Sequence, residues 1–414
     1  GIEVSELFSH VAESIDDISY EPAAREADAQ TMPIHRLLDF WRALRWLLPG
    51  WPVASARKLA RLGDERTSAA LAEILAPNRN LVAVLASGRI EGDGPAIAAA
   101  NGLIWEARSL AAHEGFFHWW TAFPTVFGPG GDGGFDVVIG NPPWDRIKLQ
   151  EVEWFAERDL AIASQARAAD RKRLIGELER KGAPLWREYR DAVARAEANA
   201  RVLGKGGDYP LLGGGDVNLY SLFVERAQSL ARPAGLVALL TPSGIAADKG
   251  AAEFFRGISA TGRLGALFDF ENRGNPGGSF FPDVDSRFKF CALVFGGADR
   301  RFAASRCAFY LHAIDELAAA ERVLPLTAED FRLVNPNTGA APIFRSRRDA
   351  DITTRVYREH PVLVDRSHGD ARKVWPLKYL RMFDMTNDSH LFLTRHELEQ
   401  RGFEPGGLNR WRRG

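Results

Sequence analysis

The sequence predicts an α/β protein in which a helical N-terminal region precedes a doubly wound sheet, with a helical insertion inside the sheet domain. Three patterns support this prediction. Apolar residues recur at three- and four-residue spacing within residues 1–115, as on amphipathic helices. Short apolar runs at 135–139 and 236–240 are typical of buried parallel strands. Residues 151–203, between these runs, are rich in charges of both signs, as in solvated helices.

The composition is that of an ordinary globular protein. The chain has 414 residues, of which 46% are hydrophobic and 26% are charged, and its formal net charge is −1. This length predicts two or three domains, and the net charge neither favours nor excludes a polyanionic partner. The two cysteines, Cys291 and Cys307, fit no metal-ligand spacing and no disulfide framework, so we expect a cytoplasmic protein.

The sequence shows no secretory signal and no membrane helix. The residues after Gly1 contain no basic region followed by an apolar run, and no stretch reaches the roughly 18 apolar residues of a membrane span. We therefore expect no membrane partner. Because the sequence lacks an initiating Met, we also expect the chain to be a piece of a longer protein.

The helices of the N-terminal region are expected to form a packing layer. Residues 34–48 place leucines and a tryptophan at helical spacing, and Pro49-Gly50-Trp51-Pro52 ends this helix. Residues 54–75 and 95–113 follow the same pattern. We expect no strand within residues 1–115.

Strands and helices then alternate. A Gly-rich loop at 128–134 leads into the first strand, and Pro233-Ala234-Gly235 separates a helix from the second. Ligands in doubly wound sheets bind at the carboxyl ends of strands, so the residues after Ile139 and Leu240 are where chemistry is expected. The further predicted elements are a helix at 218–231, a helix at 251–259, and strands at 264–270 and 287–295.

These patterns divide the chain into four regions. We expect a helical region at 1–115, an α/β core at 116–150 and 204–335, a helical insertion at 151–203, and a basic region at 345–414. The last region holds fifteen Lys/Arg against ten Asp/Glu and also contains Trp375, Tyr379 and Trp411. Basic residues interleaved with aromatic ones suit nucleic acid, but a folded surface domain has the same composition, so both interpretations remain open.

The sharpest motif is Asn141-Pro142-Pro143-Trp144, which follows the predicted strand Phe135–Ile139. Each proline fixes its own φ and lacks an N–H, and the residue before a proline is held extended. The segment is therefore stiff and offers acceptors. The Asn141 side-chain oxygen and the Pro142 carbonyl can accept both N–H bonds of a planar amine and so direct the nitrogen lone pair at an electrophile. Methyl transfer from a sulfonium needs positioning more than an acid, so neutral acceptors suffice.

Trp144 adds an aromatic face to this segment. A base stacked on such a face gains about 1–3 kcal/mol, and a base inside a duplex has to be flipped out to reach it. The residues alone predict a pocket for a planar amine. They leave open whether that amine belongs to DNA, RNA, a protein glutamine or a small molecule.

Residues 135–144 resemble the catalytic motif of the methyltransferases that modify adenine N6 in DNA. The preceding residues 118–127 resemble the lead-in of Eco57I-like restriction–modification and phage-defence methylases. Residues 218–223, 240–244, 280–284 and 382–392 are similar to later segments of that family, the last of them leading into its target-recognition region.

This resemblance implies a site-specific adenine-N6 methyltransferase that acts on double-stranded DNA and takes its methyl group from S-adenosylmethionine. It implies a Rossmann-like class I methyltransferase sheet, of which the carboxyl-terminal half is present. Asn141, Pro142, Pro143 and Trp144 would be the catalytic residues, and Phe281 would contact the other side of the flipped base. Restriction or phage-defence subunits would be possible partners.

The sequence departs from this family at the cofactor motif. The family has a glycine-rich turn after its first strand and an acidic residue for the ribose, both before the Asn-Pro-Pro motif. Residues 1–127 contain no such turn, and the glycines at 128–134 precede a strand instead of following one. We expect the main cofactor motif to lie upstream of Gly1, so no cofactor-binding residue is assigned. A catalytically silent DNA-binding or specificity subunit is the alternative that this absence favours.

Other residue groups are less informative. His35, His312 and His360 lie far apart in sequence without ligand partners at useful spacing, so no metal site is predicted. His118, next to Trp119 and Trp120, is expected in a packed aromatic cluster. Asp283, Asp285 and Lys289 have the residue types of a magnesium-dependent nuclease site, but we interpret them as a strand entry. Asp384, Asn387, Asp388 and His390 could bind a metal or DNA, but we interpret them as a capped turn.

Overall fold

The chain divides into two compact units, Gly1–Arg358 and Glu359–Gly414. The computed structural model describes residues 21–48, 65–128, 130–165, 167–205, 207–215, 217–273, 278–282, 284–366, 372–373, 375, 377, 380–384, 387–407 and 410–413.

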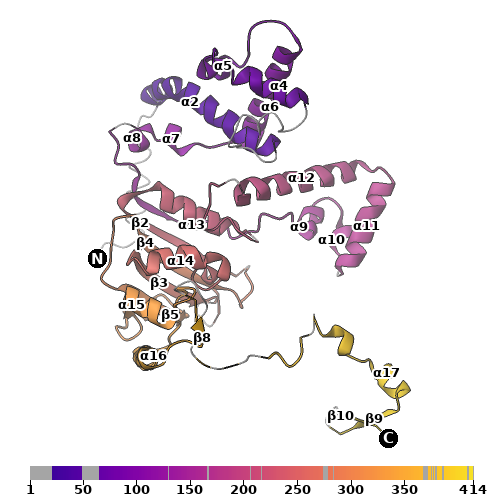
Figure 1. Ribbon diagram of the computed structural model, residues 1–414, viewed down its shortest axis with the longest axis vertical. Coiled ribbons are helices and arrows are strands. Elements are labelled where there is room, and N and C mark those ends of the chain that lie inside the picture. Colours follow the sequence, from indigo (N-terminus) through magenta and orange to yellow (C-terminus); the bar gives the residue numbers. More distant parts are fainter. Residues whose placement is uncertain are drawn as a thin grey trace. The chain divides into compact units, whose positions relative to one another are not determined.

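A six-stranded mixed sheet forms the centre of the first unit (Figure 1). Its strand order is β1-β2-β4-β3-β5-β6. The pairs β1–β2 and β3–β5 are parallel, while β4 runs antiparallel between β2 and β3, and β6 is antiparallel to β5. The predicted α/β class is confirmed. The strands are β1 Phe135–Gly140, β2 Ala231–Pro242, β3 Leu264–Glu271, β4 Lys289–Gly296, β5 Ser305–Leu311 and β6 Leu324–Leu326.

Strand β1 lies at an edge of this sheet. Its parallel pairing with β2 confirms one part of the prediction for residues 135–139. The predicted burial is wrong, because Val137 and Ile139 are 54% and 77% exposed. Among the described residues β1 pairs only with β2, so its other edge and part of its surface stay uncovered.

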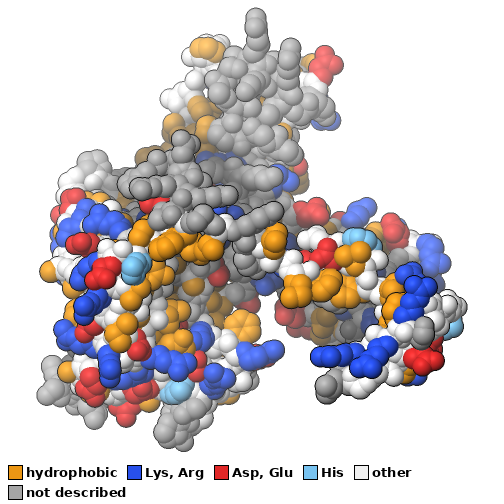
Figure 2. All heavy atoms as spheres, turned by 60° about the horizontal axis from the view of Figure 1, so that its bottom comes forward, with side chains coloured by type: hydrophobic (Ala, Val, Ile, Leu, Met, Phe, Trp, Pro, Cys, Tyr) orange, Lys and Arg blue, Asp and Glu red, His pale blue; other side chains and the backbone are white. Residues whose placement is uncertain are grey.

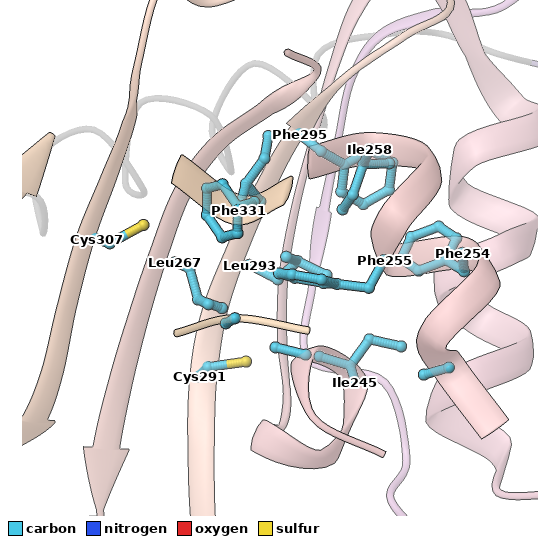
Figure 3. Close-up of a cluster of buried hydrophobic side chains, with 14 of the residues drawn as sticks. Ile245, Phe254, Phe255, Ile258, Leu267, Cys291, Leu293, Phe295, Cys307 and Phe331 are labelled. Carbon is cyan, nitrogen blue, oxygen red and sulfur yellow. The ribbon is translucent and has the colours of Figure 1, made fainter. Parts of the chain in front are cut away.

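Helices pack on the sheet and enclose its main core. Helix α13 (Leu219–Leu230) contacts β1 and β2, and α14 (Ala252–Ser259) contributes Phe254 and Phe255 to the core (Figure 3). Phe295 of β4 meets Phe254 edge-on, with 5.6 Å between ring centroids. Further helical elements are the 3-10 turns η1 Ser243–Ala246, η2 Lys249–Ala251 and η3 Asp315–Ala318, and the helices α15 Ala328–Val334 and α16 Arg347–Glu359. The boundary between the two units falls before the last residue of α16.

Both cysteines lie inside the main core. Cys291 of β4 and Cys307 of β5 are free thiols and are buried (Figure 3). Burial raises the pKa of both thiols, that of Cys291 to about 12, because the thiolate would lose its hydration. Each thiol therefore acts as a small apolar side chain.

The N-terminal helices have a core of their own. Leu44, Ile74 and Ile104 from three different helices are buried in it. The helix predicted at 34–48 is confirmed as part of the longer helix α2, and the helix predicted at 95–113 is confirmed as α6. Of the helix predicted at 54–75, residues 65–75 are described, and most of them form α4. The helices are α2 Glu21–Leu47, α4 Glu65–Ile74, α5 Leu81–Ser87, α6 Pro95–Glu114, α7 Trp119–Ala122 and α8 Pro124–Phe127.

Residues 151–203 are helical, as predicted. A small core of Phe155, Ile162 and Ile175 holds them together, and Tyr189 donates a hydrogen bond to Glu151 at 3.1 Å. Helices α11 and α12 form a hairpin with α9 and α10 beside it (Figure 1). The helices are α9 Glu151–Ala156, α10 Leu160–Ala163, α11 Ala168–Arg180 and α12 Pro184–Lys205.

The second unit is made of short elements. Its two antiparallel strand pairs are β7 with β8 and β9 with β10. The elements are β7 Val364–Asp365, β8 Arg372–Lys373, η4 Ser389–Leu391, α17 Arg395–Gln400, β9 Phe403–Gly406 and β10 Arg410–Arg413.

Two further observations concern the surface. Across the described residues, none of the helices combines the length and apolar character that a membrane crossing requires. Figure 2 shows Lys and Arg side chains among Asp and Glu on one face of the molecule, in keeping with the net charge of −1.

The central position of β4 predicts which residues stabilise the first unit. Leu293 is fully buried between β2 and β3, so Leu293→Ala should lower the free energy of unfolding by about 2–5 kcal/mol, measured by urea denaturation. The control Ile314→Ala removes a side chain that is 68% exposed and should change it by less than about 0.5 kcal/mol. Equal effects of the two substitutions would contradict this packing.

Candidate functional site

The turn Asn141–Trp144 leaves β1 directly at its carboxyl end. Asn141 and Pro143 are exposed, Pro142 is buried and Trp144 is half-buried. On the far side of the turn, the backbone N–H of Leu219 donates to the carbonyl of Asp145 at 2.9 Å. The turn is thus fixed at both ends. Among the residues that the structure describes, the Asn141 side chain has no hydrogen-bond partner and is available to a ligand.

Trp144 is held against the end of the neighbouring strand. Its indole Nε1 donates to the carbonyl oxygen of Leu240 in β2, at 3.4 Å. Its ring lies edge-on to Phe281 with 5.1 Å between centroids, and 6.1 Å from the ring of Phe290. The structure therefore brings Trp144 and Phe281 together, as an aromatic corner beside the Asn141 turn.

Asn272 fixes the loop that carries Phe281. This residue is 1% exposed and follows β3 immediately. Its Nδ2 donates to the carbonyls of Phe281 and Val284, at 2.9 and 3.0 Å, and its Oδ1 accepts from the N–H of Phe281 at 2.9 Å. Sequence analysis missed Asn272. Its position directly after a predicted strand was the available signal.

Charged side chains gather at the ends of β3 and β4. Glu271 accepts hydrogen bonds from His312 at 3.0 Å and Arg273 at 3.1 Å, and its carboxylate lies 3.1 Å from Lys289. The bond from His312, followed by those from Lys289 and Arg273, lowers the pKa of Glu271 to about 2. Asp269, on the same strand, is buried, and that burial raises its pKa although Ser243 donates a hydrogen bond to it.

A polar cleft opens on the Trp144 side of the turn. It has a volume of about 1040 Å³. Its lining residues come from the turn, the segment that follows it, α12, the end of β2 and the start of β4. They include more basic than acidic side chains: Arg146, Lys148, Arg195, Arg287 and Lys289 against Asp145, Glu153 and Asp248.

A second, mostly apolar cavity lies on the Asn141 side. Its volume is about 570 Å³, and Asn141, Pro142 and Pro143 line it together with residues 117–120 and one face of α13. The motif therefore stands between two hollows, with Trp144 lining the polar one and the three preceding residues lining the apolar one.

The apolar cavity does not by itself fit S-adenosylmethionine. A cofactor with an ammonium group and ribose hydroxyls needs carboxylate partners, and none of the residues that line this cavity is an Asp or Glu. Its charged lining side chains are Arg42 and Arg226. Cofactor contacts at this position would have to include residues other than the described lining.

An aromatic cluster follows His118 in the chain, but among the described residues the printed ring contact of His118 itself is with His35. Trp119 stacks on Phe123 at 5.7 Å, and both rings meet Phe135 of β1 edge-on at 6.0 and 5.2 Å. The fold also places the ring of His35 5.0 Å from that of His118, edge-on. The two residues are far apart in sequence, so spacing gave no signal of this contact.

The remaining groups behave as structural elements. The Asp384 N–H donates to Asp388 at 2.8 Å, and the Asn387 N–H donates to Asp384 at 3.2 Å, which confirms the capped turn. Asp285 pairs with Arg287 at 2.7 Å. Asp283 and Tyr379 lie outside the described residues.

Comparison with known proteins identifies the central segment. Residues 88–171 match the family model described as Eco57I restriction-modification methylase. The resemblance inferred from the sequence is thereby confirmed for this segment, which contains Asn141–Trp144 and is similar to restriction–modification methylases. Comparison with curated protein sequences gives no match.

Solved structures of restriction–modification enzymes are also similar over short stretches. The Type ISP enzyme LlaBIII bound to DNA is 10% identical over 42% of this chain and 10% of that one, with a TM-score of 0.22. A nuclease-deletion mutant of the Type ISP enzyme LlaGI with a DNA substrate mimic is 13% identical over 45% of this chain and 16% of that one, with a TM-score of 0.23. The protein of the DrdV–DNA complex is 13% identical over 54% of this chain and 19% of that one, and its TM-score is also 0.23. At these scores the superpositions support no argument, and the chain spans less than a fifth of each enzyme.

The Glu271 cluster predicts a pH effect on stability. The folded pKa of Glu271, about 2, is below the unfolded value of about 4.3. Its stabilisation is therefore complete above pH 4.3 and is lost as the pH falls towards 2. His312→Ala removes the largest cause of this shift, so the difference in unfolding free energy between wild type and variant should shrink between pH 5 and pH 2. A constant or growing difference in acid titrations of unfolding would contradict this assignment.

Proposed function

We propose that this chain contains the base-binding part of a DNA methyltransferase that acts on adenine N6 with S-adenosylmethionine as methyl donor, in a restriction–modification or phage-defence system. The observation that supports the proposal most directly is the position of Asn141–Trp144. This turn at a strand end is rich in acceptors, its amide has no partner among the described residues, and an aromatic corner lies beside it. It lies within the segment matched by the methylase family model.

The roles of the turn residues follow from their chemistry. The Asn141 side-chain oxygen and the Pro142 carbonyl accept the two N–H bonds of the amine. The prolines keep both oxygens in place without competing donors. This would orient the nitrogen lone pair away from the two acceptors, and a bound S-adenosylmethionine would supply the electrophilic methyl group. No ionised base is required at the turn.

The aromatic corner would receive the base itself. Trp144 offers a ring surface in the polar cleft and packs edge-on against Phe281. The Leu240 carbonyl holds the Trp144 indole, and the Asn272 hydrogen bonds fix the backbone of Phe281. In this proposal the sheet is the carboxyl-terminal half of a Rossmann-like class I methyltransferase sheet. The cofactor then depends on residues beyond the described cavity lining.

The polar cleft is the proposed path of the DNA backbone. Five Lys/Arg and three Asp/Glu line it, which favours phosphates. Arg195, Arg287 and Lys289 are paired with carboxylates outside this lining. We assign the phosphate contacts to Arg146 and Lys148, which follow the turn in the chain. The basic region at 345–414 is the second candidate surface for DNA, and nothing in its own fold distinguishes it from an ordinary surface domain.

A catalytically silent specificity subunit is the second candidate. The observation in its favour is the absence of carboxylates from the lining of the apolar cavity next to Asn141. Such a subunit would bind duplex DNA and transfer no methyl group.

The first test concerns Asn141. In the full-length protein, Asn141→Ala should reduce adenine-N6 methylation of duplex DNA by a factor on the order of 10² or more, because the amine loses an orienting acceptor. The product is measured by mass spectrometry of nucleosides. Val137→Ala on the exposed part of β1 is the matched control and should retain activity. Methylation by Asn141→Ala at the wild-type rate would refute the proposal, and duplex binding by a wild type that never methylates would favour the silent subunit.

The second test locates the DNA. Replacing Arg146 and Lys148 with Glu should weaken duplex binding and lower the slope of log affinity against log salt by about 0.9 for each phosphate that the protein no longer neutralises. The comparison variant carries Glu at Arg345, Arg347 and Arg348. A larger effect of this second variant would place the DNA on the basic region instead of the cleft, and salt-independent binding would exclude both surfaces.

A further inference from the structure

Two histidines and one aspartate converge in the N-terminal helical region. His35 and Asp39 lie one turn apart on α2, and His118 is the residue that precedes α7. The Nε2 atom of His118 lies 3.0 Å from Oδ1 of Asp39, and the Nε2 atom of His35 lies 3.6 Å from the same oxygen. Each residue offers one metal-ligand atom, and these atoms all lie within 4.8 Å of one another.

The cluster is largely shielded from water. The side chains of Asp39 and His118 are 6% and 7% exposed, while that of His35 is 40% exposed. A carboxylate in such a position has lost most of its hydration and requires positive or hydrogen-bonding partners. One side of the cluster, at His35, stays open to solvent.

The hydrogen bonds of Thr121 indicate which nitrogen of the His35 ring carries a proton. The Thr121 hydroxyl donates to the carbonyl of His118 at 3.1 Å, and its oxygen lies 3.2 Å from Nδ1 of His35. A hydroxyl has one hydrogen, so with that hydrogen on the carbonyl its oxygen accepts from Nδ1–H. In a neutral His35 the lone pair of Nε2 then points towards the Asp39 carboxylate, an arrangement that a cation between the two groups stabilises.

We propose that His35, Asp39 and His118 bind one divalent transition-metal ion of the zinc class. Two imidazole nitrogens and one carboxylate oxygen are a common donor set for zinc, and bonds of about 2.0–2.1 Å in a tetrahedral site place the ligand atoms about 3.3 Å apart. The distances of 3.0 and 3.6 Å to Asp39 are close to this value. A rotation of the partly exposed His35 ring brings the three atoms into a tetrahedral arrangement, and water takes the fourth position.

The charges around the cluster select the type of ion. Arg36 lies 3.4 Å from the other oxygen of Asp39, and the half-buried side chain of Arg108 interacts electrostatically with both Arg36 and Asp39. These positive groups weaken the binding of any cation. Affinity therefore depends on the imidazole nitrogens, which favour zinc and other transition metals over magnesium and calcium. The contact of Thr121 with His35 is the outer hydrogen bond that orients a metal-binding imidazole.

A metal at this point would connect two of the N-terminal helices. It would cross-link α2 to the start of α7, two helices that pack against each other (Figure 1). The chain from α7 leads into β1 and Asn141, and His118 lines the same apolar cavity as Asn141. This proposal does not depend on the proposed methyltransferase function.

Zinc binding by the purified, metal-free chain tests the site. Calorimetric titration should give one zinc per chain, and Co²⁺ should produce the visible absorption of a tetrahedral site. His118→Gln and Asp39→Asn keep hydrogen-bonding groups of similar size, and each should weaken zinc binding by at least about 100-fold. Thr121→Val should weaken it by about 10- to 100-fold. His113→Gln, which changes an exposed histidine outside the cluster, is the control and should bind as wild type does.

Thermal unfolding provides an independent measurement. Zinc should raise the melting temperature of the wild type and of His113→Gln, and it should have little effect on Asp39→Asn. The proposal is overturned if the folded wild type takes up no zinc. It is equally overturned if Asp39→Asn and His118→Gln bind zinc with wild-type affinity.

Discussion

The parallel pairing of β1 with β2 is the constraint on which the candidate site depends. Its register places Gly140, the last residue of β1, opposite Leu239 of β2, one residue before Leu240. The Asn141 turn and the Leu240 carbonyl are therefore neighbours, and the Trp144 indole can bond across the gap between them. A shift of one residue in this register would turn the side chains to the other face of the strand and separate these groups.

Around this pairing, short and stiff connections fix the polar and aromatic groups. The prolines restrict the turn itself, and Asn272 restricts the loop of Phe281 through three hydrogen bonds. A preorganised arrangement of this kind loses little entropy when a planar ligand enters. The Asn141–Trp144 turn also separates the polar cleft from the apolar cavity. A ligand in the cleft would therefore meet a ligand in the cavity only at this turn.

The sequence predicted the local elements better than the long-range contacts. Apolar runs identified β1, β2 and β3 because strand periodicity is a local property. The exposure of β1 was not predictable, since burial depends on what else covers a strand. The partners of His35 were missed for the same reason, because α2 and α7 meet only in the folded chain. Asn141–Trp144 could be found because its chemistry lies in consecutive residues. The Asn272 clamp was missed, because its partners Phe281 and Val284 lie 9 and 12 residues further along the β3–β4 connection, where no periodic pattern indicates a contact.

The edge of β1 that pairs with none of the described strands has a consequence for handling the chain in isolation. An unpaired strand edge offers a row of backbone donors and acceptors, and here Val137 and Ile139 add apolar surface beside it. Such an edge pairs readily with any strand that reaches it, including the same edge of another molecule. The solubility of this chain is therefore expected to depend on whether that edge is covered, and a charged or proline substitution at Val137 is the most direct way to protect it.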